Sequence, residues 1–207
     1  MEPFRTVTAT AAPIDMANVN TDQIFPARYI KKLRSEGYAD FCFHDLRLTD
    51  AGEEKPDFPL NRPRYRGAEI LVADANFGCG SSREGAVYAL QDYGVRVVIA
   101  PSFGDIFAAN ALKNGLLTVR VPAETAATLR AQLAGQEAPS MTVNLEDQTV
   151  VCGNRNTRFD IDPFEKECLL EGLNEIDLSL RAEPDIAAFE KAYRQRFAWQ
   201  FNALKRG

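Results

Sequence analysis

The stretch of the chain best suited to chemistry spans residues 76–84 and reads Asn-Phe-Gly-Cys-Gly-Ser-Ser-Arg-Glu. An apolar segment at 69–73 precedes it and predicts a strand, and a helical pattern near 82–93 follows it. The two glycines, Gly78 and Gly80, allow a tight turn and a close approach of the backbone to a ligand. The segment therefore predicts a ligand-binding loop between a strand and a helix.

The three residues after the glycines, Ser81, Ser82 and Arg83, are expected at the start of that helix. Free N–H groups and the helix dipole make a helix N-terminus favourable for anions. A guanidinium adds a rigid fork that matches a carboxylate, which lysine cannot copy. The arrangement suits the binding of a carboxylate and the stabilisation of an anionic serine oxygen. The alternatives are that Ser81 only caps the helix and that Arg83 only pairs with Glu84 or a nearby aspartate.

The 207-residue chain has the composition of an ordinary globular protein, with 45% hydrophobic and 26% charged residues. Its formal net charge of −5 argues against nucleic acid and anionic membranes as partners. The N-terminus lacks the basic and apolar segments of a signal peptide, and no stretch reaches the roughly 18 apolar residues of a membrane span. We expect a cytoplasmic protein that folds as a single domain over residues 1–207.

Cysteine and histidine usage limits the metal sites that the chain can build. The four cysteines are spread without a Cys-x-x-Cys pair, at Cys42, Cys79, Cys152 and Cys168. His44 is the only histidine. We therefore expect no metal in this chain and free thiols. A less favoured alternative makes Cys79 an activated nucleophile, which would need a base that only His44 could supply.

The hydrophobic pattern predicts an α/β fold with a central, mostly parallel sheet flanked by helices and additional short strands. A β-α-β-α-β order between residues 69 and 121 requires crossover connections and parallel strands. Prolines and charges at 47–67 predict a loop excursion, and the pattern at 183–207 predicts a C-terminal helix. The other expected strands and helices are strands at 4–11, 69–73, 95–100, 116–121, 141–145 and 149–152, and helices at 82–93, 104–113, 123–133 and 163–172.

Several motifs occur together and in order, which is far more specific than a lone glycine loop. They are the segments at 20–24, 76–84, 100–107, 113–117 and 162–166, followed by Cys168-Leu169-Leu170 and Gly172-Leu173. With them the chain closely resembles the small subunit of 3-isopropylmalate dehydratase, the swivelling domain of the aconitase superfamily. The resemblance covers residues from about 7 to 192.

The resemblance implies a swivelling β/β/α domain that closes as a lid over a large subunit carrying a [4Fe-4S] cluster. The substrate would be a small di- or tricarboxylic acid, dehydrated to an enoic acid and rehydrated at the neighbouring carbon. Ser81 matches the family's catalytic base, and Ser82 and Arg83 match substrate-binding positions. Backbone donors at Gly78 and Gly80 could line the same pocket, although each glycine could equally serve only the turn.

Two further segments match positions near the active site of the family. Asp22 matches an aspartate expected to orient the serine or the arginine, and its alternative role is an Asx-turn or helix cap. A basic segment follows, and the resemblance makes it face the variable part of the substrate; its candidates for specificity are Arg28, Tyr29, Lys31 and Lys32. The alternative for this segment is a solvated charged face.

The chain departs from the resemblance at Gly85, where the family commonly has histidine, and at Asp177, which replaces a usual glycine. Loss of the polar ring at position 85 could open space for a different substrate. We expect a hydro-lyase small subunit in leucine biosynthesis that interconverts 2-isopropylmalate and 3-isopropylmalate. The alternatives are a paralogue acting on citraconate, methylmalate or homoaconitate, and a non-catalytic domain that binds anions or regulates.

Overall fold

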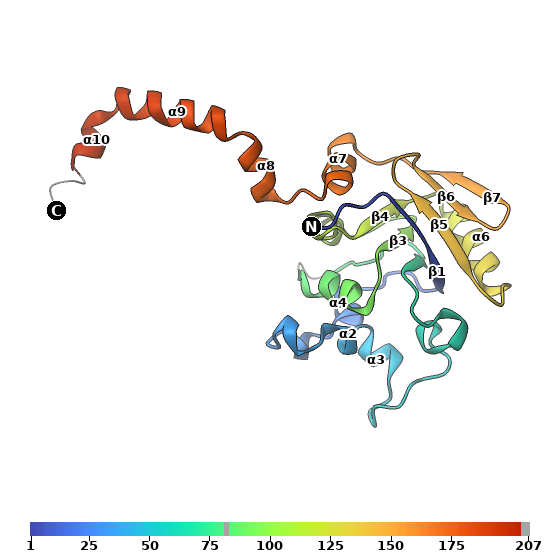
Figure 1. The fold of residues 1–207 in the computed structure, drawn as a ribbon. Coiled ribbons are helices and arrows are strands. Elements are labelled where there is room, and N and C mark those ends of the chain that lie inside the picture. The colour runs from blue at the N-terminus through green and yellow to red at the C-terminus, as the bar shows by residue number, and fades with distance from the viewer. Residues whose placement is uncertain (81–82, 204–207) are drawn as a thin grey trace. The chain divides into compact units, whose positions relative to one another are not determined.

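The computed structural model describes residues 1–80 and 83–203 of the chain (Figure 1). The chain divides into two compact units, Met1–Gly172 and Leu173–Gly207. The first unit carries every strand that the structure describes, and the second carries the last three helices. A single domain over residues 1–207 therefore stays a prediction.

One seven-stranded sheet organises the first unit, with strand order β4-β3-β2-β1-β5-β6-β7. Neighbours are parallel from β4 to β1 and antiparallel from β1 to β7, which confirms the parallel centre and the additional short strands beside it. The strands are β1 (Thr6–Ile14), β2 (Ile70–Ala73), β3 (Val97–Ala100), β4 (Leu117–Arg120), β5 (Ser140–Asn144), β6 (Thr149–Cys152) and β7 (Arg155–Arg158).

The long strand β1 joins the two halves of the sheet. Its first part pairs with β5, and residues 11–14 pair with β2. The main helices of the first unit are α4 (Gly85–Tyr93), α5 (Asp105–Asn114), α6 (Ala123–Ala134) and α7 (Pro163–Glu171). Short helices fill the connection from β1 to β2: α1 (Thr21–Ile24), η1 (Ala27–Tyr29), η2 (Arg34–Glu36), α2 (Tyr38–Phe41), α3 (His44–Arg47), η3 (Pro59–Asn61) and η4 (Pro63–Tyr65).

Apolar side chains cover both faces of the parallel strands, as a buried parallel sheet requires. In β2, Leu71 and Ala73 belong to a cluster with α4, α5 and the short helices. Ile70 and Val72 point the other way, into a cluster with α6 and the inner side of the antiparallel strands. All four side chains are fully buried, which explains why this strand reads as an unbroken apolar run.

Two details of the predicted elements need correction. In the described part of 183–207, where one helix was expected, there are two, α9 (Glu183–Arg196) and α10 (Ala198–Ala203), and α8 (Glu175–Arg181) precedes them. Strand β7 was not expected. The excursion at 47–67 is anchored in the core, because Leu60 and Tyr65 are fully buried. Within the described part of the chain, no helix has the length and apolarity needed to span a membrane.

Candidate functional site

The loop that carries the predicted site lies between the segments that follow β1 and β3. Asn20 forms an isolated bridge with Cys79, and Phe77 forms one with Phe103. The N–H of Thr21 donates to the carbonyl of Cys79 at 2.8 Å. These backbone bonds hold the loop on both sides, so the first part of the predicted site has a defined path.

The two glycines of the loop have left-handed backbones, with φ of +74° at Gly78 and +97° at Gly80, as a tight turn requires. The N–H of Gly78 donates to the carbonyl of Val19 at 2.7 Å. Because the fold itself occupies this donor, the geometry favours the turn role for Gly78. Substrate binding by Gly80 stays a prediction.

Helix α4 begins at Gly85 and not near residue 82, which corrects the expected helix start. Its N-cap residue is Glu84, so the alternative in which Ser81 only caps this helix is not supported. The Glu84 carboxylate accepts hydrogen bonds from Tyr88 Oη at 3.2 Å and from Asn114 Nδ2 at 3.1 Å. The start of α4 is therefore set by a contact with the end of α5.

Arg83 and Asp22 come together at the predicted site. Nη2 of Arg83 lies 2.7 Å from Oδ1 of Asp22, and 23% and 52% of these side chains are exposed. Arg83 precedes the first turn of α4, and the predicted base Ser81 and the predicted ligand Ser82 lie outside the described residues. The ion pair joins α1 to the start of α4, which places a carboxylate-binding cation at a position that solvent can reach.

Asp22 is not the cap of its own helix. Asn20 caps α1, because its side chain accepts from the N–H of Gln23 at 2.8 Å and Gln23 Oε1 accepts from the N–H of Asn20 at 2.9 Å. Of the two roles open to Asp22, the geometry favours orientation of the arginine.

Two of the basic side chains in the segment after α1 form ion pairs with neighbouring carboxylates. Arg28 pairs with Asp45 and also contacts Nδ1 of His44 at 3.1 Å, and Lys32 pairs with Glu36 at 2.9 Å. The hydrogen bond from Arg28 lowers the pKa of Asp45 to about 2.

The other two specificity candidates differ in their surroundings. The ring of Tyr29 stacks on Phe41 with 4.1 Å between centroids, and Lys31 is exposed. Specificity roles for Arg28, Tyr29, Lys31 and Lys32 stay predictions.

Gly85 leaves no open space beside the site, contrary to the expectation from the sequence. A Cβ added at this position would lie 3.0 Å from Cδ1 and Cε1 of Phe25, whose ring already fills the space. Phe25 is 2% exposed and was not identified from the sequence. Its only sequence signal was its place directly after the motif at 20–24.

None of the four cysteines, Cys42, Cys79, Cys152 and Cys168, forms a disulfide bond in the structure, and only Cys79 is partly exposed. Its Sγ lies 3.5 Å from the carbonyl of Asn18. His44, the one candidate base, instead contacts Arg28 and Asp45, so its described contacts do not support an activated Cys79.

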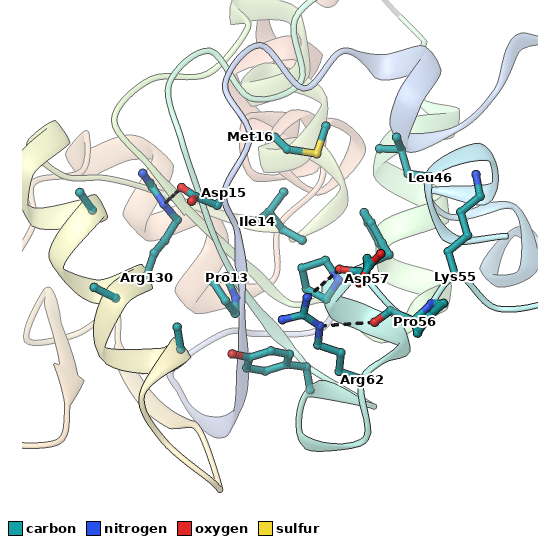
Figure 2. Close-up of a pocket in the computed structure, with 16 residues that line it drawn as sticks. Pro13, Ile14, Asp15, Met16, Leu46, Lys55, Pro56, Asp57, Arg62 and Arg130 are labelled. Atoms are coloured by element: carbon teal, nitrogen blue, oxygen red, sulfur yellow. Dashed lines mark hydrogen bonds and ion pairs between the residues drawn. The ribbon is translucent and has the colours of Figure 1, made fainter.

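A separate cavity of about 850 Å³ lies beside the end of β1, lined by that end, the loop at 55–62 and α6 (Figure 2). On one side Arg130 reaches from α6 to Asp15, and on the other Arg62 donates to the carbonyls of Pro56 and Asp57. None of the site residues predicted from the sequence lines this cavity. The cavity is therefore not the predicted anion site.

Arg130 ties α6 to the carboxyl ends of β1 and β2. Its Nε donates to Asp15 at 3.0 Å, Nη1 to the carbonyl of Ala73 at 2.8 Å and Nη2 to Asp74 at 2.9 Å.

We expect Arg130→Met to lower the free energy of unfolding by about 2–3 kcal/mol, because the three hydrogen bonds that this largely buried cation donates are lost. Urea unfolding measures this loss, and Arg62→Met is the control, expected to cost less than about 1 kcal/mol. Equal losses in both variants would contradict the anchoring role.

Comparison with known proteins gives consistent similarities. The family model of the aconitase C-terminal domain matches residues 1–124. A 3-isopropylmalate dehydratase small subunit from Bacillus licheniformis is 48% identical over 96% of this chain and 98% of its own length. One from Geobacillus kaustophilus is 49% identical over 95% of this chain and 100% of its own length. The crystal structure of a 3-isopropylmalate dehydratase from Methanocaldococcus jannaschii has a TM-score of 0.62 and 26% identity, covering 89% of this chain and 99% of that one.

Proposed function

The chain belongs to the family of 3-isopropylmalate dehydratase small subunits, which carry the aconitase C-terminal domain, and we propose that it performs the same function. It is then one subunit of a hydro-lyase that interconverts 2-isopropylmalate and 3-isopropylmalate in leucine biosynthesis. The observation that carries the proposal is 45–49% identity to such subunits over nearly the whole chain. The Arg83–Asp22 pair beside the glycine loop supports it.

In this proposal the chain contributes the carboxylate grip and the base. The planar guanidinium of Arg83 binds a carboxylate of the substrate, and Asp22 holds that guanidinium in position. Ser81 takes the proton next to a carboxylate as the hydroxyl leaves the neighbouring carbon, and the return of water to the other carbon completes the isomerisation. An ordinary serine is too weak an acid for this role, so the site must exclude water and stabilise the anion.

The proposal requires a large-subunit partner that holds the iron–sulfur cluster. Among residues 1–80 and 83–203, no three His, Cys, Asp or Glu side chains gather in a way that could hold a metal ion. The cluster would supply an iron that binds the substrate's hydroxyl and carboxylate. The cytoplasm, where thiols stay reduced, is the compartment that we propose for the complex.

The proposal is tested by combining the purified chain with a large subunit whose cluster has been reconstituted. We expect interconversion of 2-isopropylmalate and 3-isopropylmalate by the pair and none by either subunit alone. Citraconate, methylmalate and homoaconitate serve as competing substrates in the same assay. Turnover of one of these acids in preference to isopropylmalate would replace the proposed substrate, and turnover of none would refute the hydro-lyase.

Substitution of Arg83 tests the carboxylate grip. In the assembled enzyme, Arg83→Lys keeps the charge and removes the fork, so we expect kcat/KM to fall about 100-fold. Steady-state kinetics with either isomer measures the change. Arg155→Lys, at an exposed position of β7, is the matched control and is expected to leave kcat/KM within a factor of two. A similar kcat/KM in both variants would show that Arg83 forms only a surface ion pair.

A further inference from the structure

The ring of Phe25 occupies the place that a side chain at position 85 would take. The carbons Cδ1 and Cε1 of the ring lie 3.0 Å from the ideal Cβ position of Gly85. Real Cβ atoms rarely have contacts this short, although the backbone of Gly85 is not left-handed and would accept alanine. The restriction at position 85 therefore comes from packing and not from backbone conformation.

The ring of Phe25 is packed on its other sides, so it cannot easily move away from Gly85. Tyr38 packs against it with 4.5 Å between centroids, and Phe41 meets it edge-on at 6.2 Å. Phe25 and Tyr38 are 2% and 8% exposed. The backbone of Phe25 is also held, because its N–H donates to the carbonyl of Thr21 at 2.9 Å. A larger residue at 85 must therefore displace the start of α4.

The segments that meet through Phe25 and Gly85 are the ones that carry the Asp22–Arg83 pair. Phe25 is the C-cap of α1, the helix that contains Asp22, and Gly85 is the first residue of α4 directly after Arg83 and Glu84. The ring of Phe25 thus lies where a Cβ at the first residue of α4 would stand. Arg83 precedes that residue by two positions, so a displaced first turn of α4 would shift Arg83 as well.

We propose that Phe25 is a positioning residue for the substrate-binding Arg83. The ring of Phe25 can take this position only because residue 85 is glycine and has no side chain. The inference rests on the proposed function, because it assigns Arg83 to a substrate carboxylate. It also extends to the basic segment: Tyr38 Oη donates to the carbonyl of Lys32 at 2.8 Å. Tyr38, whose ring packs on Phe25, therefore connects the surroundings of Arg83 with the basic segment.

The test uses Gly85→Ala, Phe25→Leu and the double variant, each assembled with the large subunit. Alanine in the first turn of a helix normally stabilises a protein. Here we expect Gly85→Ala to lower the Tm of the isolated chain by about 3–6 °C, because the site is already full. In the Phe25→Leu background the same change should raise Tm by about 2 °C.

The kinetic readout separates positioning from stability alone. Displacement of Arg83 weakens carboxylate binding in the ground state and the transition state alike, so Gly85→Ala should raise KM about tenfold and change kcat less than threefold. The double variant should recover most of the lost affinity. Gly135→Ala is the matched control, since its added Cβ meets only Gln132 and Ala131 carbonyls at 3.6 and 3.7 Å.

The outcomes distinguish this inference from the proposed function. Normal turnover by the wild-type complex together with an unchanged KM in Gly85→Ala would overturn the inference alone, whatever the change in Tm. A raised KM that Phe25→Leu does not relieve would overturn it as well. No turnover by the wild-type complex would refute the proposed function, and with it the assignment of Arg83 to a substrate.

Discussion

Gly78→Ala is expected to destabilise the chain by about 4 kcal/mol. The added Cβ would lie 2.2 Å from Cγ and 2.6 Å from Cδ1 of Phe107. The backbone at Gly78 is also left-handed, a conformation that alanine adopts only with strain. The effect therefore combines steric overlap with backbone strain.

Neither partner in this overlap can move easily. Phe107 is 2% exposed and packs edge-on against Phe77 with 5.5 Å between centroids. The N–H of Gly78 is bonded to Val19, and the N–H of Gly104 is bonded to the carbonyl of Phe77 at 2.9 Å. The loop is thus fixed on both sides by the segments after β1 and β3.

Urea unfolding of the isolated chain measures the loss, and Gly80→Ala is a close control. Gly80 has the same left-handed backbone, but its added Cβ would meet Asn20 and Thr21 only at 3.6 Å. We expect it to cost about 1–2 kcal/mol, the strain without the overlap. If both variants lose the same free energy, the contact with Phe107 is not what requires glycine at position 78.

The sequence predicts well the elements whose pattern is local. Strand β2, helix α5 and helix α6 appear within one or two residues of their expected bounds, because apolar periodicity and helix-ending glycines act over a few neighbours. The start of α4 was misplaced because Glu84 is held by Asn114, which is distant in sequence. Strand β7 was missed because Arg155–Arg158 is polar on both faces and depends on pairing with β6.

In the candidate site too, local sequence patterns pointed to some residues, whereas the roles of others depend on contacts between distant segments. The glycine loop and Arg83 became candidates because their residue types are distinctive at short spacing. Asp22 was assigned only through the resemblance, since no local rule predicts that residues after β1 reach the start of α4. Phe25 was missed because a buried aromatic residue has no chemical signature, and its importance depends on the absence of a side chain at Gly85.

Ser81→Ala is expected to lower kcat of the assembled enzyme about 1,000-fold while the complex still binds substrate. The reason is that the proposed reaction assigns to Ser81 the removal of the proton next to the carboxylate. Stability should hardly change, because Glu84 and not Ser81 occupies the N-cap position of α4. Ser82→Ala is the comparison within the same loop and is expected to raise KM more than it lowers kcat. A Ser81→Ala enzyme with kcat within threefold of wild type, on isopropylmalate of either isomer, would remove the serine base from the proposed mechanism and leave Arg83 as a carboxylate-binding residue alone.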